Sequence, residues 1–449
     1  MYGAGNIGRG FIGQLFYESG YEVSFIDVNM NVIDKLNSDG GYPVYITNGD
    51  HYDERPVKNV RGIDGRDEKA IAEAMAEADI MATAVGVNIL KFIAAPFAAG
   101  VKLRCARGIE TPLNVIICEN MIEADQYFSS LVKACLDDGE KAYFDEYIAL
   151  VEPSIGRMVP ATPKEISEKN LLAVCVEPYC ELPVDKNAFK GEIPEIKNMI
   201  PFAPFDFYIR RKLFMHNMSH ALTAYFGSLK GYTYIWEAAK DAEIKLIALR
   251  ALTESSRALS REYGVPLDEL LCFSENLLSR FENKLLGDTI ERVGKDTQRK
   301  LSENDRFVGA AKLCLRHGIS PVNICAGIAA GLKFAPDSDE ASARVVKDVQ
   351  ENGIKHAVDM CVAKRLSRTH GLLSRTDKIK SRRLSDIDRL HAEPRKNPHD
   401  FFAPDERLFA VHVKRGAGCK PERDPIVSHN LPPRRFRGQI RDRKFNVFP

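Results

Sequence analysis

Short apolar runs and helix-like patterns alternate along residues 1–195. The runs have the length and composition of buried parallel strands and cover residues 22–28, 79–86 and 114–120. The segments between them repeat apolar positions every three or four residues, as amphipathic helices do, at residues 29–38 and 67–78. This alternation predicts a Rossmann-type, doubly wound α/β domain.

From residue 196 to about residue 368 the pattern becomes helical. Apolar positions recur at helical spacing in residues 211–229, 235–264 and 268–283 and again around residue 342, whereas strand patterns are few. The joint between the two patterns is placed at residues 190–204, a segment with three prolines. We therefore predict a second, mainly α-helical domain over residues 196–368.

Residues 369–449 lose this periodicity and are basic. From residue 371 on, the chain has 19 Lys and Arg but 10 Asp and Glu, although the whole chain has a net charge of only +1. Such a composition suits a disordered extension, and a nucleic-acid-binding tail is the alternative. We expect that removing this tail leaves the function of the first two domains intact.

Composition narrows the class of protein. The chain is 45% hydrophobic and 28% charged, as globular domains are, and it has no run of 18 apolar residues that could span a membrane. The N-terminus lacks the basic and apolar pattern of a secretory signal. Ten cysteines without a C-x-x-C pair indicate reduced thiols, so we expect a cytoplasmic protein.

A glycine motif, G-x-G-x-x-G, opens the chain. In dinucleotide sites its glycines allow a tight turn, close approach of a pyrophosphate and packing of helix on strand. An aspartate 19 residues further on ends the next predicted strand, where a carboxylate can bind the ribose of NAD and repel the 2′-phosphate of NADP. The expected NAD contacts are Gly3, Gly5, Asn6, Ile7, Gly8 and Asp27. A plain strand–helix turn with a surface aspartate is the alternative.

The strand expected before this motif is short. Only Met1 and Tyr2 precede Gly3, whereas the motif normally follows a strand at the buried centre of the sheet. We therefore expect the natural gene product to begin upstream. A version extended by several residues should then be more stable.

A second cluster of polar residues, K-x-x-x-x-N-x-x-H, is formed by Lys212, Asn217 and His220. On an α-helix these residues and His216 share one wide face. A lysine in a desolvated cleft can act as a base for a hydroxyl proton, while Asn and His bind the oxygen. A solvated helix face is one alternative. A zinc site is another, disfavoured because Asn217 stands where a zinc protease has its catalytic glutamate.

Five motifs occur in a familiar order: GAGNIGRGFIG at 3–13, TAVG at 83–86, CENM at 118–121, RMVP at 157–160 and RKLFMHNMSHALTAYFG at 211–227. Together they resemble the polyol-specific long-chain dehydrogenase family over residues 1–365, in particular its members acting on mannitol 1-phosphate. The resemblance implies NAD-dependent, metal-free interconversion of D-mannitol 1-phosphate and D-fructose 6-phosphate, a small-molecule substrate pair.

The resemblance also implies residue roles. Lys212 would be the general base, Asn217 and Asn120 would stabilise the developing alkoxide, and His220 would orient the substrate. The nucleotide cleft would be lined by Thr83, Val85 and Gly86. The candidates for binding the substrate phosphate are Arg157, Arg210, Arg211 and His216. The role of Glu119 stays open, and Gly156 stands where many relatives have an aspartate.

Two other functions stay open at the level of sequence. The chain could act on another polyol or hexuronate, as mannitol 2-dehydrogenase and fructuronate reductase do. It could also be a catalytically inactive NAD-binding protein. Rates measured with a panel of substrates would distinguish the first alternative from an enzyme that acts on mannitol 1-phosphate. Bound NAD without turnover would support the second alternative.

Overall fold

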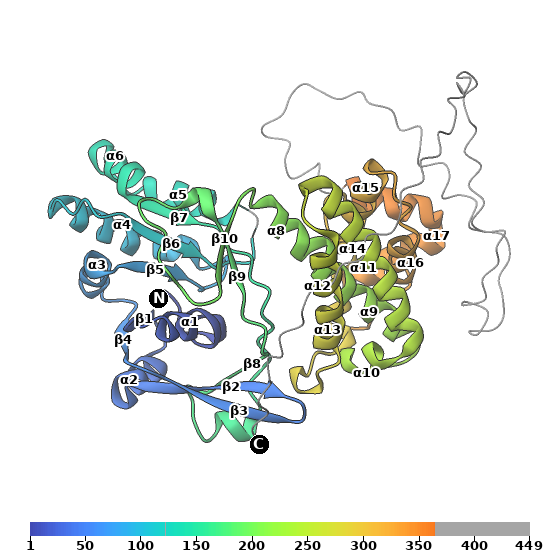
Figure 1. Cartoon of the computed structure of the whole chain (residues 1–449), viewed down its shortest axis with the longest axis horizontal. Coiled ribbons are helices and arrows are strands. Elements are labelled where there is room, and N and C mark those ends of the chain that lie inside the picture. The colour runs from blue at the N-terminus through green and yellow to red at the C-terminus, as the bar shows by residue number, and fades with distance from the viewer. Residues whose placement is uncertain (122, 364–449) are drawn as a thin grey trace, which may run out of the picture. The chain divides into compact units, whose positions relative to one another are not determined.

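A parallel sheet lies at the centre of the first part of the computed structural model, which describes residues 1–121 and 123–363 (Figure 1). Within this sheet β1 pairs with β4, β5 pairs with β6, and β6 pairs with β7, all in parallel. The strands are β1 (Val23–Asp27), β4 (Val60–Asp64), β5 (Ile80–Thr83), β6 (Leu113–Ile117) and β7 (Ile148–Val151).

Tyr2 lies between β1 and β5 and forms single parallel bridges to Ile26 and Thr83. Its N–H donates to the Ala82 carbonyl at 2.8 Å, and the N–H of Gly3 donates to the Ile26 carbonyl at 2.8 Å. Tyr2 is buried. The residues before the glycine motif thus occupy the central position expected for the first strand.

Both faces of this sheet are buried under helices. Phe25 and Ile116 belong to one core cluster, whereas the next residues, Ile26 and Ile117, belong to another. Neighbouring strand residues therefore point to opposite sides of the sheet. The helices are η1 (Gly8–Gly13), α1 (Gln14–Glu18) and α2 (Met30–Asp39) on the first side, and α3 (Glu68–Glu77), α4 (Leu90–Ala106), α5 (Ala124–Lys133) and α6 (Asp138–Tyr147) along the rest of the domain. The predicted doubly wound α/β domain is confirmed.

An antiparallel hairpin that the sequence pattern did not reveal follows α2. Strand β2 (Gly41–Asn48) pairs with β3 (His51–Lys58) through a two-residue turn, and β8 (Val174–Val176) pairs in parallel with β2. Most side chains of β3 are exposed, so it has no apolar alternation to detect. A further parallel pair, β9 (Leu182–Asp185) and β10 (Met199–Phe202), and the short α7 (Lys164–Ser167) and η2 (Lys186–Ala188) complete this part.

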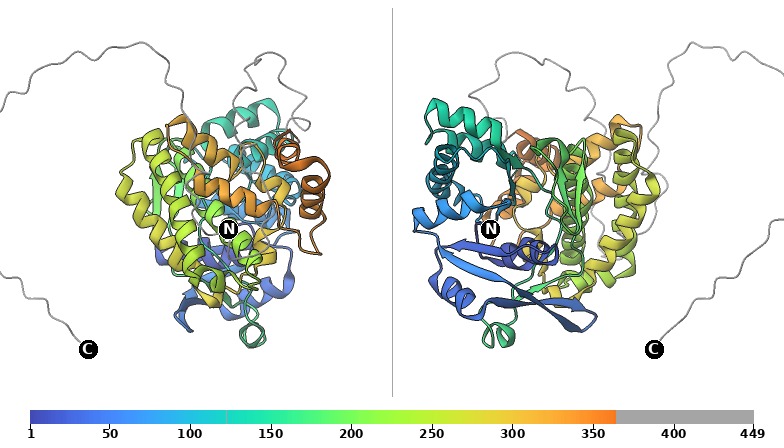
Figure 2. Two further views of the ribbon diagram at one scale, coloured as in Figure 1. Left: turned by 90° about the vertical axis from the view of Figure 1, so that its right-hand side faces the viewer. Right: turned by 60° about the vertical axis from the view of Figure 1, so that its left-hand side comes forward.

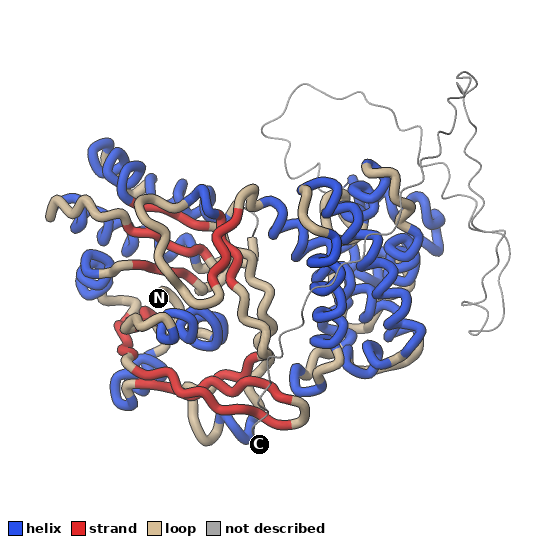
Figure 3. Tube along the Cα trace, in the orientation of Figure 1, coloured by secondary structure: helices blue, strands red, loops and turns tan. Residues whose placement is uncertain are grey.

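The second part is helical, as predicted, and no strand follows β10 in the described part of the chain (Figures 2 and 3). Its first elements are α8 (Asp206–Arg211), η3 (Lys212–Asn217), α9 (Met218–Leu229), α10 (Ile235–Lys240), α11 (Ala242–Tyr263) and α12 (Leu267–Phe281). They are followed by η4 (Lys284–Leu286), α13 (Ile290–Gly294), α14 (Thr297–Lys300), α15 (Val308–Arg316), α16 (Val322–Gly331) and α17 (Glu340–Ala363).

The single helix expected over residues 235–264 is interrupted at Asp241. This residue is extended, and its carboxylate accepts hydrogen bonds from the N–H groups of Glu243 and Ile244. An aspartate in this position caps the next helix and ends the previous one. The apolar periodicity continues across the break, so the pattern alone could not reveal it.

Three further expectations concern the basic tail, membrane-spanning helices and the cysteines. The basic tail, residues 369–449, lies outside the described residues. In the described part no helix is long and apolar enough to cross a membrane. All nine cysteines in that part are free thiols.

Candidate active site

The glycine loop has the close backbone contacts expected of a dinucleotide turn. Gly3 has φ of +97°, and a Cβ atom there would lie 2.6 Å from the carbonyl oxygen of Ala84. A Cβ atom at Gly8 would overlap the carbonyl oxygen of Gly3. Gly5 and Asn6, in contrast, are exposed, and no protein atom lies within 4 Å of a Cβ built at Gly5. The fold requires two of these glycines, whereas the space beside Gly5 is open to a ligand.

Asp27 connects this loop to the end of β1. Its Oδ2 accepts a hydrogen bond from the N–H of Ala4 at 2.7 Å, and its Oδ1 accepts one from the N–H of Asn29 at 3.0 Å. The carboxylate is therefore fixed beside the glycine loop while remaining partly exposed. This arrangement fits a dinucleotide with its pyrophosphate on the loop and a ribose near the carboxylate.

Alanine at Gly5 and alanine at Gly8 are expected to affect different properties, dinucleotide binding and stability respectively. Gly5→Ala should leave the fold intact but weaken dinucleotide binding by at least about tenfold, because the methyl group enters the ligand's space. Gly8→Ala should destabilise the protein by about 1–3 kcal/mol or more, because the methyl group meets backbone. Thermal melting and NADH titration measure the two effects separately.

The two variants control for each other. If Gly5→Ala melts earlier while binding NADH normally, the open space beside Gly5 is not part of the dinucleotide site.

Thr83 and Val85 are held by Glu119 at the ends of β5 and β6. The Thr83 hydroxyl donates to Oε2 of Glu119 at 2.6 Å, and the N–H of Val85 donates to Oε1 at 3.0 Å. Burial raises the pKa of Glu119, although these hydrogen bonds oppose the rise. The Thr83 hydroxyl is fully buried, while Gly86 is exposed with φ of +91°. Glu119 therefore has a positioning role at these strand ends.

Lys212 and Asn120 meet, although 92 residues separate them in the chain. The Lys212 Nζ donates to Oδ1 of Asn120 at 3.4 Å. Asn120 follows β6, at the carboxyl end of the sheet where α/β folds bind ligands. Burial lowers the pKa of Lys212 to about 8, the charge of Arg306 lowers it further, and Glu152 opposes this shift. A lysine with this pKa can exchange a proton near neutral pH.

The backbone from Lys212 to Asn217 forms the π-helical turn η3 rather than the α-helix that the sequence predicted. A π turn has more residues per turn, so the angles expected for an α-helix do not apply between Lys212 and Asn217. Such turns are frequent at functional sites. The structure records no hydrogen bond from the half-buried Asn217 side chain to another described residue.

His216 and Phe281, which are buried, form an aromatic cluster with the half-buried His220. The His220 ring stacks on Phe281 at a centroid distance of 4.7 Å, and the two imidazoles are 6.0 Å apart. Burial lowers the pKa of both histidines, to about 3 for His220, so they are neutral. The Nε2 of His220 is a buried atom that lies 3.5 Å from Oδ2 of Asp288 and has no hydrogen-bond partner in the described part of the chain.

Among the residues described, no group of three or more His, Cys, Asp or Glu side chains is placed to hold a metal ion.

The arginines proposed from the sequence for the substrate phosphate have other partners. Arg157 is buried and donates to the carbonyls of Glu177 and Gly10 at 3.0 Å and to Oε1 of Gln14 at 2.8 Å. Burial lowers its pKa to about 10. These contacts attach Arg157 to the helix behind the glycine loop.

Arg210 and Arg211 lie at the end of α8. Arg210 pairs with Asp206 at 2.9 Å and with Glu262 at 3.3 Å. The Arg211 guanidinium stacks over Phe273 at 4.1 Å and lies 3.6 Å from Glu181. Both charges are already paired.

The sequence interpretation missed three charged groups, of which Glu152 and Arg306 lie near Lys212 and Arg280 lies near His216. Glu152 directly follows β7, and burial raises its pKa to about 7. Its position after the apolar run 148–151 was the available signal, because strand ends collect functional groups. Arg280 lies in α12 and Arg306 lies in the loop before α15, and nothing in their local sequence distinguishes them from surface arginines.

Comparison with known proteins identifies the family. A family model described as "Mannitol dehydrogenase Rossmann domain" matches residues 1–198, and one described as "Mannitol dehydrogenase C-terminal domain" matches residues 205–381. Mannitol-1-phosphate 5-dehydrogenase of Thermoanaerobacter pseudethanolicus is 37% identical over 360 residues, which cover 80% of this chain and 91% of that protein.

Two solved structures share the fold at 15% sequence identity. D-sorbitol dehydrogenase in substrate-free form has a TM-score of 0.64, with 80% of this chain and 94% of that chain covered. Pseudomonas fluorescens mannitol 2-dehydrogenase, solved with NAD and D-mannitol, has a TM-score of 0.58, with 82% and 94% covered. The chain therefore belongs to the mannitol dehydrogenase family, and it is an oxidoreductase that uses a nicotinamide cofactor.

Proposed function

We propose that this protein interconverts D-mannitol 1-phosphate and D-fructose 6-phosphate with NAD and without a metal. The observation that carries the proposal is the contact between Lys212 and Asn120. It joins a lysine whose pKa lies near 8 to an amide at the carboxyl end of the sheet. The relative at 37% identity is named for this reaction.

The chain's own residues supply the proton transfer and bind the reacting oxygen. A nicotinamide cofactor held by the glycine loop would supply the hydride-transfer chemistry. In alcohol oxidation the neutral amine of Lys212 takes the hydroxyl proton, and in ketone reduction its ammonium returns it. Asn120 accepts from Lys212 through Oδ1, so its amide N–H groups remain to donate to the substrate oxygen. Asn217 and neutral His220 complete the set of groups that orient this oxygen.

We assign the cofactor to residues 1–195 and the catalytic lysine to residues 196–368. Gly3, Gly5, Asn6, Ile7, Gly8 and Asp27 form the dinucleotide side, with Val85 and Gly86 at its edge. We propose NAD rather than NADP because the fixed Asp27 carboxylate would repel a 2′-phosphate. A reaction of sugar phosphates with this cofactor suits a cytoplasmic enzyme.

The function is tested by following NADH absorbance with fructose 6-phosphate, fructose and fructuronate, in the presence of a chelator. We expect rapid NADH oxidation with fructose 6-phosphate only, and slower oxidation of NADPH. Preference for fructose or fructuronate would instead identify a different polyol or hexuronate dehydrogenase. NADH binding without turnover on any of the three would identify an inactive relative.

A further inference from the structure

The proposed substrate carries a doubly negative phosphate, and a cation must bind it away from the reacting carbon. Arg157, Arg210 and Arg211 are already paired, and His216 is buried and neutral. Arg280 also lies near the histidines, but Glu177 neutralises it at 2.6 Å. Arg306, in the loop before α15, is a further candidate.

Arg306 is mostly buried and only partly partnered. Its side chain is 12% exposed, and its Nε donates to Oδ1 of Asp305 at 2.9 Å. In the described part of the chain, its two terminal nitrogens make no hydrogen bond. These nitrogens are not among the buried polar atoms that lack a partner, so an anion from solvent can reach them. The planar pair of terminal N–H groups of Arg306 matches two oxygens of a phosphate.

The segment around Arg306 packs on the helix that carries Lys212. The ring of Phe307 stacks on Tyr225 of α9 at a centroid distance of 5.7 Å. A Cβ atom at Gly309 would lie 2.8 Å from Cε1 of Phe214 in η3. These contacts fix the backbone that follows the arginine against η3 and α9. The arginine's charge also lowers the pKa of Lys212, as expected for a neighbouring cation.

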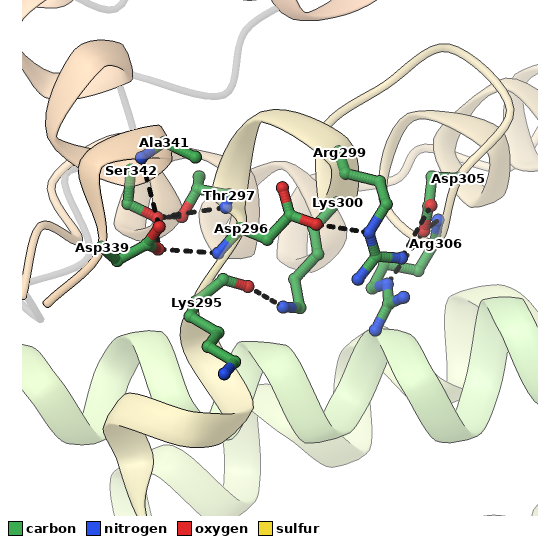
Figure 4. A network of polar contacts seen from close by, with 10 residues as sticks. All are labelled: Lys295, Asp296, Thr297, Arg299, Lys300, Asp305, Arg306, Asp339, Ala341 and Ser342. Carbon is green, nitrogen blue, oxygen red and sulfur yellow. Dashed lines mark hydrogen bonds and ion pairs between the residues drawn. The ribbon is translucent and has the colours of Figure 1, made fainter. Parts of the chain in front are cut away.

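A polar network orients Arg306, as Figure 4 shows. Asp305, which binds the Nε of Arg306, also lies 3.6 Å from Nη1 of Arg299. Arg299 in turn donates to Asp296 at 2.6 Å. Lys300, next to it, donates to the carbonyl of Lys295, and burial lowers its pKa to about 7. More cationic than anionic groups gather here, so the network is suited to an anion.

We propose that the terminal nitrogens of Arg306 bind the phosphate group of the sugar phosphate, with Asp305 as the residue that positions the guanidinium. This inference rests on the proposed function. It assigns recognition of the phosphate to the loop before α15 and leaves Arg157 and Arg211 with structural contacts.

Arg306→Gln tests this assignment, since glutamine keeps a polar side chain but removes the charge. We expect the KM for fructose 6-phosphate to rise about 30–100-fold, whereas the dissociation constant of NADH and the melting temperature change little. Inorganic phosphate should inhibit the wild type in competition with fructose 6-phosphate, and this inhibition should be lost in the variant. Asp305→Asn should raise the same KM by a smaller factor.

Arg316→Gln is the matched control, because this exposed arginine of α15 pairs with Glu262 instead. It should leave the KM and the phosphate inhibition unchanged. An unchanged KM with retained phosphate inhibition in folded Arg306→Gln would overturn the phosphate site while leaving the proposed function intact. A wild type that reduces fructose but not fructose 6-phosphate would overturn the proposed function, and the phosphate site with it.

Discussion

Replacing Lys212 by alanine is expected to lower the rate of fructose 6-phosphate reduction by roughly 10²–10⁴-fold, the range for loss of a general acid or base. Lys212 is the group beside Asn120 whose pKa of about 8 lets it exchange a proton near neutral pH. The dinucleotide contacts lie on a separate loop, so NADH binding should persist. Steady-state kinetics and NADH titration on the same preparation measure both effects.

Lys245→Ala serves as the control for this variant. Lys245 is 48% exposed on α11 and pairs with Glu282, and it contacts none of the proposed catalytic residues. The control should keep nearly full activity. If Lys212→Ala keeps more than about a tenth of the wild-type rate, the lysine is not the proton-transfer group.

Replacing Glu177 by alanine is expected to lower the free energy of unfolding by about 3–5 kcal/mol, as when one partner of a buried ion pair is lost. The side chains of Glu177 and Arg280 are 1% and 7% exposed. The Glu177 carboxylate accepts from Nη2 of Arg280 at 2.6 Å, from its Nε at 2.7 Å and from the N–H of Met158 at 2.5 Å. Its removal leaves a buried guanidinium without a counter-ion.

Urea unfolding measures this loss, and Glu303→Ala is the control. Glu303 pairs with Lys312 at the surface, where an ion pair contributes at most about 1 kcal/mol. Adding Arg280→Met to Glu177→Ala should restore part of the stability, since the unpaired charge is gone. A loss below about 1 kcal/mol in Glu177→Ala would show that the pair is not structural.

The sequence predicted the strands that are mostly buried. The runs 22–28, 79–86 and 114–120 became β1, β5 and β6; every residue of β5 and β6 is buried, and in β1 the apolar residues are buried whereas Ser24 and Asp27 are half-buried. Strand β3 was missed because most of its residues face solvent. The π-helical turn at Lys212 was also missed, since its residues have the same apolar spacing as an α-helix.

The candidate site could be proposed from the sequence where it depends on a local motif. The glycine loop and the K-x-x-x-x-N-x-x-H segment are each short enough to detect in one stretch of chain. Whether an arginine is free or paired depends instead on residues distant in sequence. Arg157 donates to the carbonyl oxygens of Gly10 in η1 and of Glu177, which follows β8. Whether the terminal nitrogens of Arg306 stay free depends on how its loop packs on α9.

The pH dependence of kcat tests most directly whether Lys212 acts as the base. The measurement is the rate of mannitol 1-phosphate oxidation by NAD, and of the reverse reduction, from about pH 6 to about pH 10. Oxidation requires the neutral amine, so kcat should rise through about pH 8 and then level off, while kcat for reduction should fall over the same range. Rates in both directions that do not change with pH across this range would contradict the assignment of Lys212.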